Sequence, residues 1–313
     1  MYFPYFRGKR FELIALAELT PLLSGSSRIT AILEPVRTAE TEVRKIRRLA
    51  QEDVPLILIE NPNRGELATR HDVAQGMISQ CSGNPNLIAG FLVGATTQSR
   101  IIEAFLHRNS RGQVAFVHLG SAAQSDRLAQ LQVSAGNVAY NVFLEGRSSR
   151  GYREGFTAGR PVILDDPFER RTKNEDYPPH EFFSDRHNTY RGEGFYGFGD
   201  FLTVGNHFTE TGGAALAVAI HLTNREGNNE LWIRHFVSDR TSGRGVDTPG
   251  KFLEALAKTV TFIRSRANWR LTAGGREFIE LHSRQHFPGL GFVKKVSMKH
   301  HVELLDAIVA GSP

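Results

Sequence analysis

Ionisable side chains stand at the ends of a series of short apolar segments along the chain. Each segment is rich in Val, Ile and Leu until its last positions, where an acid or an imidazole follows. Carboxylates held close together must share protons or bind a cation, so this pattern predicts a site for Mg²⁺ or Mn²⁺. The residues at these ends are Glu34, Glu60 with Asn61, His118, Glu145, Asp165 with Asp166, Asp200 and His221.

Residue type assigns an expected role to each member of this set. The expected metal ligands are Glu34, Glu60, Asp165 and Asp166. An imidazole has an ordinary pKa of about 6.5, which suits proton transfer at neutral pH. The expected catalytic residues are therefore the histidines His118, His221 and His235, together with the carboxylate of Asp200. Guanidinium groups fit phosphate oxygens, and the expected substrate-binding residues are Arg170, Arg171, Arg191 and Asn61. For each residue alone, the alternative is a structural role in which the side chain bonds loop amides at a strand end.

Alternating strands and helices would position these side chains. Near-continuous apolar runs are typical of parallel strands buried on both faces, and the intervening segments have helical periodicity. One strand follows another at intervals of roughly 25–35 residues, the size of a βα unit. The predicted strands are 29–35, 54–61, 87–94, 114–120, 138–144 and 161–166, and the predicted helices between them are 38–51, 66–79, 97–107 and 122–132.

The alternation changes after Asp166. Residues 167–197 have no regular pattern, which predicts a long functional loop or lid. A short strand at 200–205 and a β-hairpin at 216–237 are expected next, because two apolar runs flank a turn-rich link. The remaining predicted helices are 249–264, 275–284 and 297–309.

These elements predict an α/β fold of the TIM-like (β/α)8 barrel type. The first hairpin strand would be the eighth barrel strand, and an N-terminal helix over 6–19 would cover the bottom. Residues 1–313 would form a single domain. In such a barrel the strand ends meet at one opening, so the acids would face one another there. An open doubly wound sheet is the competing topology.

Composition excludes several other classes of protein. The 38 Lys and Arg outnumber the 33 Asp and Glu by only 5, and a hydrophobic share of 40% is enough for a sizeable core. A single cysteine, Cys81, excludes an internal disulfide and a Cys-based metal cluster. No HExxH, Walker or GxSxG motif is present, and no GxGxxG string opens a predicted helix. No apolar run of about 20 residues is present, and basic residues follow the apolar N-terminal segment, so we expect a cytoplasmic protein without membrane contact.

Two further segments could contact a ligand or a partner. Lys294, Lys295, Lys299, His300 and His301 form a basic segment that would be either a solvated helix face or a phosphate contact. The Gly-rich run from Arg191 to Phe198 carries aromatic side chains that would be exposed and available to a partner. These aromatic residues are Phe195, Tyr196 and Phe198.

Several longer strings resemble a known family. The chain resembles the first member of the "sce" two-gene pair, an uncharacterised bacterial family, and is similar to the phage-type beta protein family. The strings are 2–9, 12–16, 183–187, 197–201, 217–222, 234–239 and 287–291, and they span nearly the whole chain. They include Asp185, His187, Asp200, His221, His235 and Asp239. Arg186 stands where the family often has an acid, which argues against a ligand role at that position.

The resemblance implies a phage-related or defence-like two-gene system with a small nuclease-like partner protein from the adjacent gene. The resemblance supplies no activity. The strand-end acids and the expected barrel favour a metal-assisted hydrolase acting on a phosphodiester or nucleotide, whereas the implied partner gene supports an alternative. The alternative is a non-catalytic binding or regulatory subunit for the nuclease-like partner, with nucleic acid or nucleotide as a further ligand.

Overall fold

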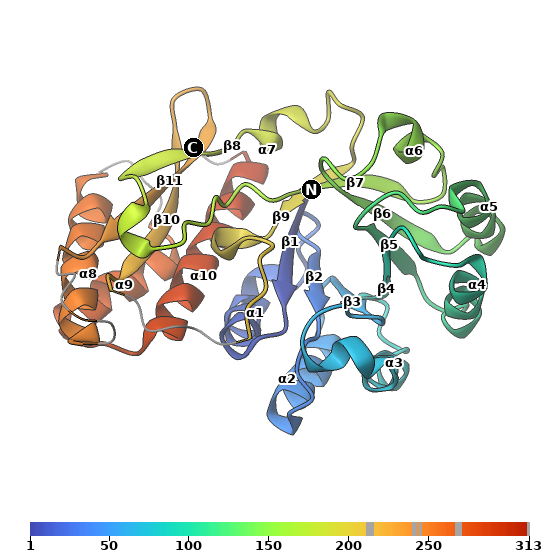
Figure 1. Cartoon of the computed structure of the whole chain (residues 1–313), viewed down its shortest axis with the longest axis horizontal. Helices are drawn as coiled ribbons and strands as arrows, with labels where there is room; N and C mark the ends of the chain where they lie inside the picture. Colours follow the sequence, from blue (N-terminus) through green and yellow to red (C-terminus); the bar gives the residue numbers. More distant parts are fainter. Residues whose placement is uncertain (211–215, 240–242, 244–245, 267–270, 312–313) are drawn as a thin grey trace. The chain divides into compact units, whose positions relative to one another are not determined.

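The computed structural model describes residues 1–210, 216–239, 243, 246–266 and 271–311 (Figure 1). The chain forms two compact units. Unit 1 contains Met1–Leu13, Thr20–Asp166 and Thr189–Phe201, and unit 2 contains Ile14–Leu19, Pro167–Asn188 and Leu202–Pro313. Among the helices described, none is both long and apolar enough to cross a membrane.

Unit 1 is a closed barrel of eight parallel strands, which confirms the predicted TIM-like architecture. Each strand pairs with the next in the order β1-β2-β3-β4-β5-β6-β7-β9, and β9 pairs with β1 to close the ring. The strands are β1 (Tyr2–Arg7), β2 (Ala31–Glu34), β3 (Leu56–Ile59), β4 (Leu87–Val93), β5 (Val114–His118), β6 (Val138–Leu144), β7 (Arg160–Asp165) and β9 (Gly197–Asp200).

The first and last barrel strands differ from the prediction. Residues 2–7 form β1, so the helix expected from residue 6 begins only at Arg10; α1 (Arg10–Leu23) connects β1 to β2 and takes the place of a barrel helix. The eighth position belongs to β9, and the first hairpin strand lies in a separate sheet. Glycine permits this closure, because a Cβ at Gly199 would lie 2.2 Å from the carbonyl oxygen of Phe3.

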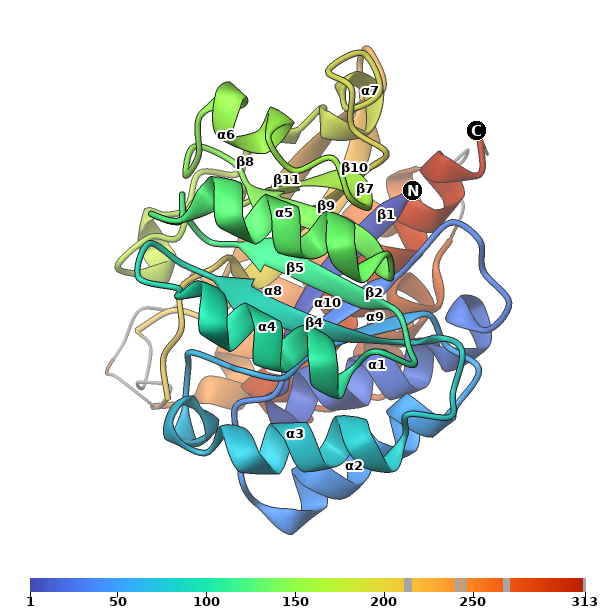
Figure 2. The ribbon, with the colours of Figure 1, turned by 90° about the vertical axis from the view of Figure 1, so that its right-hand side faces the viewer.

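Amphipathic helices cover the outside of the barrel. In α4, Ile102, Phe105 and Leu106 recur on one face and are buried; Phe105 packs on the rings of Phe91 and Phe116, which project outward from β4 and β5. Figure 2 shows α4 and α5 side by side across these strands. The helices between β2 and β7 are α2 (Glu40–Gln51), η1 (Glu66–Thr69), α3 (His71–Gln80), α4 (Ser99–Arg108), α5 (Ser125–Ala135) and α6 (Arg150–Glu154).

Unit 2 is built on a three-stranded antiparallel sheet in the order β10-β11-β8. The predicted hairpin is confirmed as β10 (Ala219–Glu226) and β11 (Glu230–Val237). Its third strand comes from the segment expected to be a loop. That segment contains η2 (Asn174–Asp176), β8 (His180–Ser184) and α7 (Arg186–Thr189), while η3 (Leu202–Val204) follows β9.

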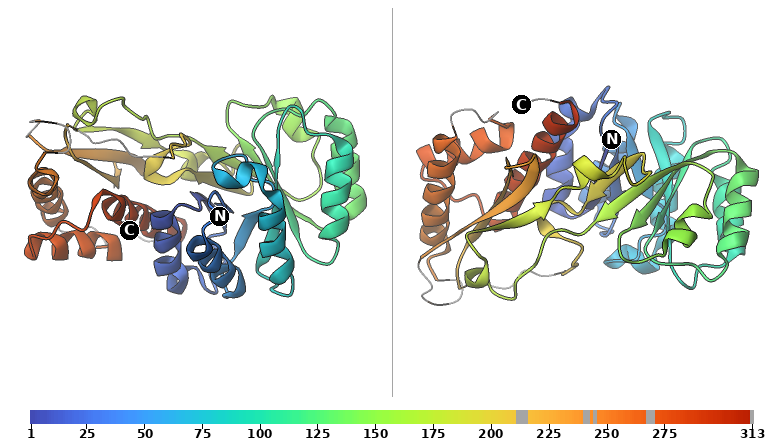
Figure 3. Two further views of the ribbon diagram at one scale, coloured as in Figure 1. Left: turned by 60° about the horizontal axis from the view of Figure 1, so that its bottom comes forward. Right: turned by 90° about the horizontal axis from the view of Figure 1, so that it is seen from above.

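Three helices pack against one face of this sheet, where the orange and red helices lie beside the tan strands (Figure 3, left). Ile220 and Leu222 of β10 enter an apolar core with Phe252, Leu256 and Val296. These helices are α8 (Thr248–Ser265), α9 (Ala273–Ser283) and α10 (Leu290–Val309).

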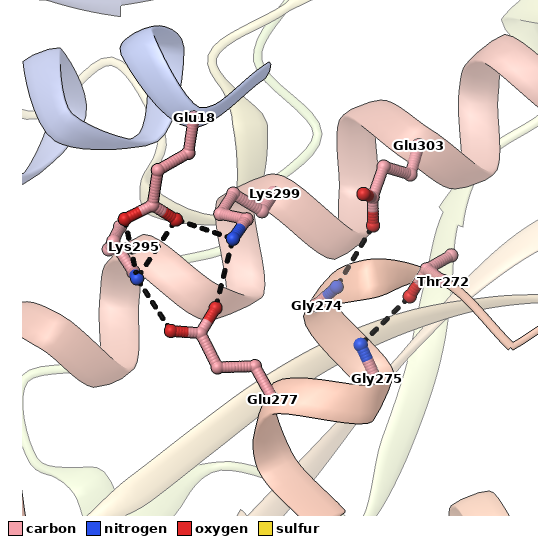
Figure 4. Close-up of polar contacts among 8 residues, drawn as sticks. All are labelled: Glu18, Thr272, Gly274, Gly275, Glu277, Lys295, Lys299 and Glu303. Carbon is pink, nitrogen blue, oxygen red and sulfur yellow. Dashed lines mark hydrogen bonds and ion pairs between the residues drawn. The ribbon is translucent and has the colours of Figure 1, made fainter. Parts of the chain in front are cut away.

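The basic segment of α10 is buried except at Lys294, which is exposed. Lys295 is 1% exposed and donates hydrogen bonds of 3.0 Å and 2.6 Å to Glu18 and Glu277, and Lys299 bonds the same two carboxylates (Figure 4). Two buried cations therefore share two acids, which compensates the cost of removing them from water. His300 is also buried, where its Nδ1 and Nε2 lie 2.7 Å from the Thr272 hydroxyl and from a backbone carbonyl oxygen.

Candidate active site

The strand-end acids of unit 1 do not all point to one side of the barrel wall. Successive residues of a strand point to opposite faces, and Ile57 and Ile59 of β3 point into the barrel core. Glu60 therefore points outward, where Arg108 and Asn109 at the end of α4 bond its carboxylate. Because consecutive side chains alternate between the two faces of a strand, Asn61 points into the barrel and Glu60 points out of it.

Glu34 at the end of β2 does face the barrel interior. Its carboxylate accepts hydrogen bonds of 2.9 Å from the Tyr5 hydroxyl and from the Asn63 amide, and the Arg7 guanidinium lies 3.5 Å away. Glu34 is 1% exposed. These partners, Arg7 included, compensate its charge without a metal ion, so its geometry fits a structural role.

Of the other acids, Asp165 and Asp200 are neighbours, in register on β7 and β9. Asp165 ends β7 and Asp166 follows it on the opposite face; Asp165 is partly exposed and Asp166 exposed. Asp200 on β9 accepts a 2.9 Å hydrogen bond from the Tyr2 hydroxyl. Asn61 bonds both backbone groups of Leu92 and so extends the β3–β4 ladder. Within the described ranges, no group of three or more His, Cys, Asp or Glu side chains could hold a metal ion.

His118 lies outside the barrel wall in a closed cluster. Its Nε2 is 2.8 Å from the Asn141 side-chain oxygen and its Nδ1 is 2.9 Å from the Tyr152 hydroxyl. Phe143 and Phe156 pack on the ring. Burial lowers the pKa of His118 to about 4, and the side chain is fully enclosed. Both ring nitrogens have protein partners, so nothing in this geometry presents the imidazole to a substrate.

Unit 2 contains a cavity of about 560 Å³ with a strongly cationic lining. Four cationic side chains, Arg170, Arg171, Lys173 and Lys294, and one acidic one, Glu175, contribute to its wall, a formal balance of 4 − 1 = +3. The rest of the wall is mixed in polarity and includes Phe168, Thr172, Asn174, Tyr177, Thr203, Val204, Thr209, Leu216, Ala219, His221, Leu290, Gly291, Val293 and Ser297.

A chain of three hydrogen-bonded side chains crosses the sheet and ends at this cavity. His221 of β10 and His235 of β11 are directly opposite in register, and their Nδ1 atoms are 2.7 Å apart. His235 Nε2 lies 3.0 Å from Glu181 Oε1 of β8. His235 is buried, whereas His221 is half-buried and lines the cavity. We call Glu181, His235 and His221 the sheet relay.

Aromatic rings and burial set the electrostatics of the sheet relay. Tyr177 stacks on His235 with a centroid distance of 4.7 Å, and Phe168 meets His221 edge-on at 5.1 Å. Burial, His235 and Lys294 together hold the pKa of His221 well below its ordinary value. Burial, followed by the Arg171 guanidinium, lowers the pKa of His235 to about 4. Both imidazoles are therefore neutral at pH 7.

The carboxylate at the other end of the sheet relay is oriented by an arginine. Arg171 bonds Glu181 at 2.5 Å and Glu169 at 2.7 Å. Burial raises the pKa of Glu181, and this effect exceeds the lowering by Arg171. Arg171 thus orients Glu181 as well as contributing to the cavity wall.

Of the three remaining cations, Arg170 and Lys173 lie in the segment between β7 and η2, and Lys294 lies in α10. Arg170 bonds the ring of His207, and Lys294 lies in the second turn of α10. Leu290, Gly291 and Ser297 of the same helix also line the cavity, so its wall includes the positive end of a 20-residue helix. Cationic side chains supported by a helix start form a favourable environment for an anion.

The structure thus brings together four of the predicted residues: His221, His235, Arg170 and Arg171. It leaves His118, Asp200, Asn61 and the four expected metal ligands in unit 1, together with Arg191, which bonds the Tyr190 hydroxyl at 2.9 Å. Sequence reasoning missed Glu181 and Tyr177, because their segment lacked a strand pattern. The predicted hairpin was the useful sequence feature for finding this site, because it placed His221 and His235 on paired strands.

Comparison with known proteins assigns no function to this site. The chain matches no protein-family model, and no curated protein sequence matches it significantly.

Proposed function

We propose that the chain is a hydrolase acting on a phosphodiester or nucleotide, with its active site in the unit 2 cavity. One observation carries this proposal: the sheet relay ends, at His221, on a cavity whose wall has a formal charge of +3. Buried histidines bonded to a carboxylate serve proton transfer in many enzymes, and clustered cations bind phosphate.

The cations would bind the substrate and stabilise the transition state. Lys294 and Arg170 approach the cavity from different segments, so they can contact different oxygens of one phosphoryl group. Negative charge accumulates on these oxygens as a nucleophile attacks phosphorus. The cavity, at about 560 Å³, has the volume of a small-molecule site.

His221 would act as the general base. Its lowered pKa keeps the imidazole neutral at pH 7, so it can accept a proton from an attacking water. The resulting hydroxide oxygen bonds to phosphorus as the bond to the leaving oxygen breaks. Because Glu34 and Glu60 are bonded elsewhere in unit 1, no step of this proposal uses them as metal ligands.

The test is hydrolysis by the full chain of a diester, a monoester and a nucleotide: bis(p-nitrophenyl) phosphate, p-nitrophenyl phosphate and ATP. The His221→Asn variant should lose activity, whereas His107→Asn, at an exposed position of α4, should keep it. Equal activity in the His221→Asn variant would refute the assignment. So would the absence of both hydrolysis and binding for all three probes.

A binding or regulatory subunit is the second candidate, and an exposed aromatic strip favours it. Phe182 is 48% exposed and lies opposite Trp232 in register, with His180 packed on the same indole. The patch expected around Phe198 is not available, because that ring is buried in the barrel wall, although Tyr196 is exposed. A complex with the small nuclease-like partner that persists in the His221→Asn variant, without hydrolysis by the wild type, would support this role.

A further inference from the structure

The bonding of the sheet relay restricts where its protons lie. Two Nδ1 atoms face each other at 2.7 Å, so one must carry a proton and the other must accept it. When Glu181 is ionised, His235 Nε2 must donate to it, which leaves His235 Nδ1 as an acceptor. His221 then donates through Nδ1, and its Nε2 is the unprotonated nitrogen.

Protonation of Glu181 reverses every one of these bonds. The carboxylic acid donates to His235 Nε2, His235 donates through Nδ1 to His221, and His221 carries its proton on Nε2. The two arrangements differ by one proton. In the first, His221 offers a lone pair to the cavity, and in the second it offers an N–H group.

We infer that Glu181 is the terminal proton acceptor of the sheet relay, which lets His221 act as a base without remaining an imidazolium. Water transfers a proton to His221 Nε2 and becomes the hydroxide nucleophile. The Nδ1 proton of His221 passes to His235 Nδ1, and the Nε2 proton of His235 passes to Glu181. Both imidazoles end neutral with reversed tautomers, and Glu181 ends as a carboxylic acid.

The surroundings favour this final location of the proton. Lys294 from α10 and Arg171 from the segment before β8 disfavour a positive charge on the two histidines, and the Tyr177 and Phe168 rings exclude water from them. Burial and Glu169 raise the pKa of Glu181, while Arg171 opposes this. In Ser-His-Asp triads the carboxylate stays ionised. Here the depressed imidazole pKa values and the raised carboxyl pKa shift the balance toward Glu181.

The inference rests on the proposed function, but its test does not require a substrate. Selectively ¹⁵N-histidine-labelled full chain is titrated by NMR, which distinguishes the two neutral tautomers from imidazolium. As pH falls, His221 should change from the Nδ1–H to the Nε2–H tautomer before either histidine becomes imidazolium. His118 is an internal control, because the Asn141 oxygen holds it as the Nε2–H tautomer throughout.

Two variants should change the tautomer reversal of His221 in different ways. Glu181→Gln can keep the bond to His235 but cannot accept the relayed proton, so the tautomer reversal should disappear and kcat should fall at least about 10-fold with KM little changed. Arg171→Met removes a cation beside Glu181, so the reversal should move to higher pH. Direct conversion of wild-type His221 to imidazolium, or an unchanged titration in Glu181→Gln, would overturn the relay.

The same measurements separate this inference from the proposed function. Tautomer reversal without hydrolysis or phosphate binding would overturn the proposed function and leave the relay standing. Hydrolysis that depends on His221 in a protein without tautomer reversal would overturn the relay and leave the proposed function standing.

Discussion

His118 in unit 1 and His221 in unit 2 have similar aromatic neighbours, but only His221 lines a cavity. Both are neutral imidazoles packed on aromatic rings, and burial lowers the pKa of each. The His118 cluster is closed, with Asn141 and Tyr152 on its two ring nitrogens. The sheet relay instead ends on a cationic cavity. A lowered pKa therefore does not by itself identify a catalytic histidine, whereas access to a charged cavity separates the two.

The Lys–Glu cluster of Figure 4 supports the same distinction. Lys295 and Lys299 are as unusual by burial as either histidine, yet each bonds both Glu18 and Glu277. Such a mutually paired cluster stabilises packing and has a formal charge of zero. Lys294, one residue before Lys295, lines the cavity instead.

The largest expected effect is on catalysis. Replacing His221 by Asn should lower kcat at least about 100-fold, because a general base contributes roughly 10²–10⁴ to the rate. The free energy of unfolding of this variant should change by less than about 1 kcal/mol, because the Asn side-chain amide can keep the hydrogen bond to His235 Nδ1. Steady-state kinetics and urea unfolding on one preparation measure both quantities. A large loss of stability with unchanged kcat would reverse the roles assigned to the two histidines.

The closed cluster should show the opposite behaviour. His118→Leu leaves the Asn141 oxygen and the Tyr152 hydroxyl without their imidazole partner, and each unsatisfied buried group costs about 1–3 kcal/mol. Urea denaturation should therefore show a loss of roughly 2–4 kcal/mol, with kcat per folded molecule unchanged. If kcat falls while the protein stays stable, His118 is not merely structural.

The cationic wall predicts a smaller effect on binding. Lys294→Met should weaken inorganic phosphate binding roughly 10-fold in calorimetry, because a charge-assisted hydrogen bond contributes about 1.5 kcal/mol or more. Lys45→Met, on α2 of unit 1, is the matched control and should bind phosphate as the wild type does. Equal losses in both variants would indicate nonspecific electrostatics.

Acid should destabilise the fold through its buried histidines. His118, His235 and His300 have folded pKa values of about 4, below the ordinary 6.5, so the unfolded chain binds more protons between these limits. Their stabilising contribution is present above about pH 6.5 and is lost as pH falls toward about 4, by up to about 1.4 kcal/mol per pH unit for each group. Urea unfolding at pH 7, 6 and 5 measures this slope, which should be shallower in His118→Leu. An equal slope in wild type and variant would contradict the neutral state assigned to His118.

The smallest effect is expected from divalent metal. Millimolar Mg²⁺ or Mn²⁺, compared with EDTA, should leave the melting temperature unchanged, because Glu34 and Glu60 are already bonded to protein partners. A rise that disappears in the Glu60→Gln, Asp165→Asn double variant would instead restore the metal site expected from the strand ends.

The barrel could be predicted from sequence because buried parallel strands are apolar along their whole length. The same feature conceals which face a terminal side chain occupies, so Glu60 and Asn61 were both assigned to the opening although they point oppositely. Tyr2–Arg7 escaped prediction because Pro4 and its aromatic residues do not resemble a buried aliphatic strand. Glu181 could not be found without the pairing of β8 with β11, a contact between segments about 50 residues apart.

The most direct test of the central claim is a phosphate titration of the ¹⁵N-histidine-labelled chain at pH 7. Inorganic phosphate binding in the cavity should change the Nε2 shift of His221 in a saturable way and leave the His118 signals in place. Lys294→Met should require more phosphate for the same change. If His221 does not respond at saturating phosphate, or if His118 responds equally, the unit 2 cavity is not the active site.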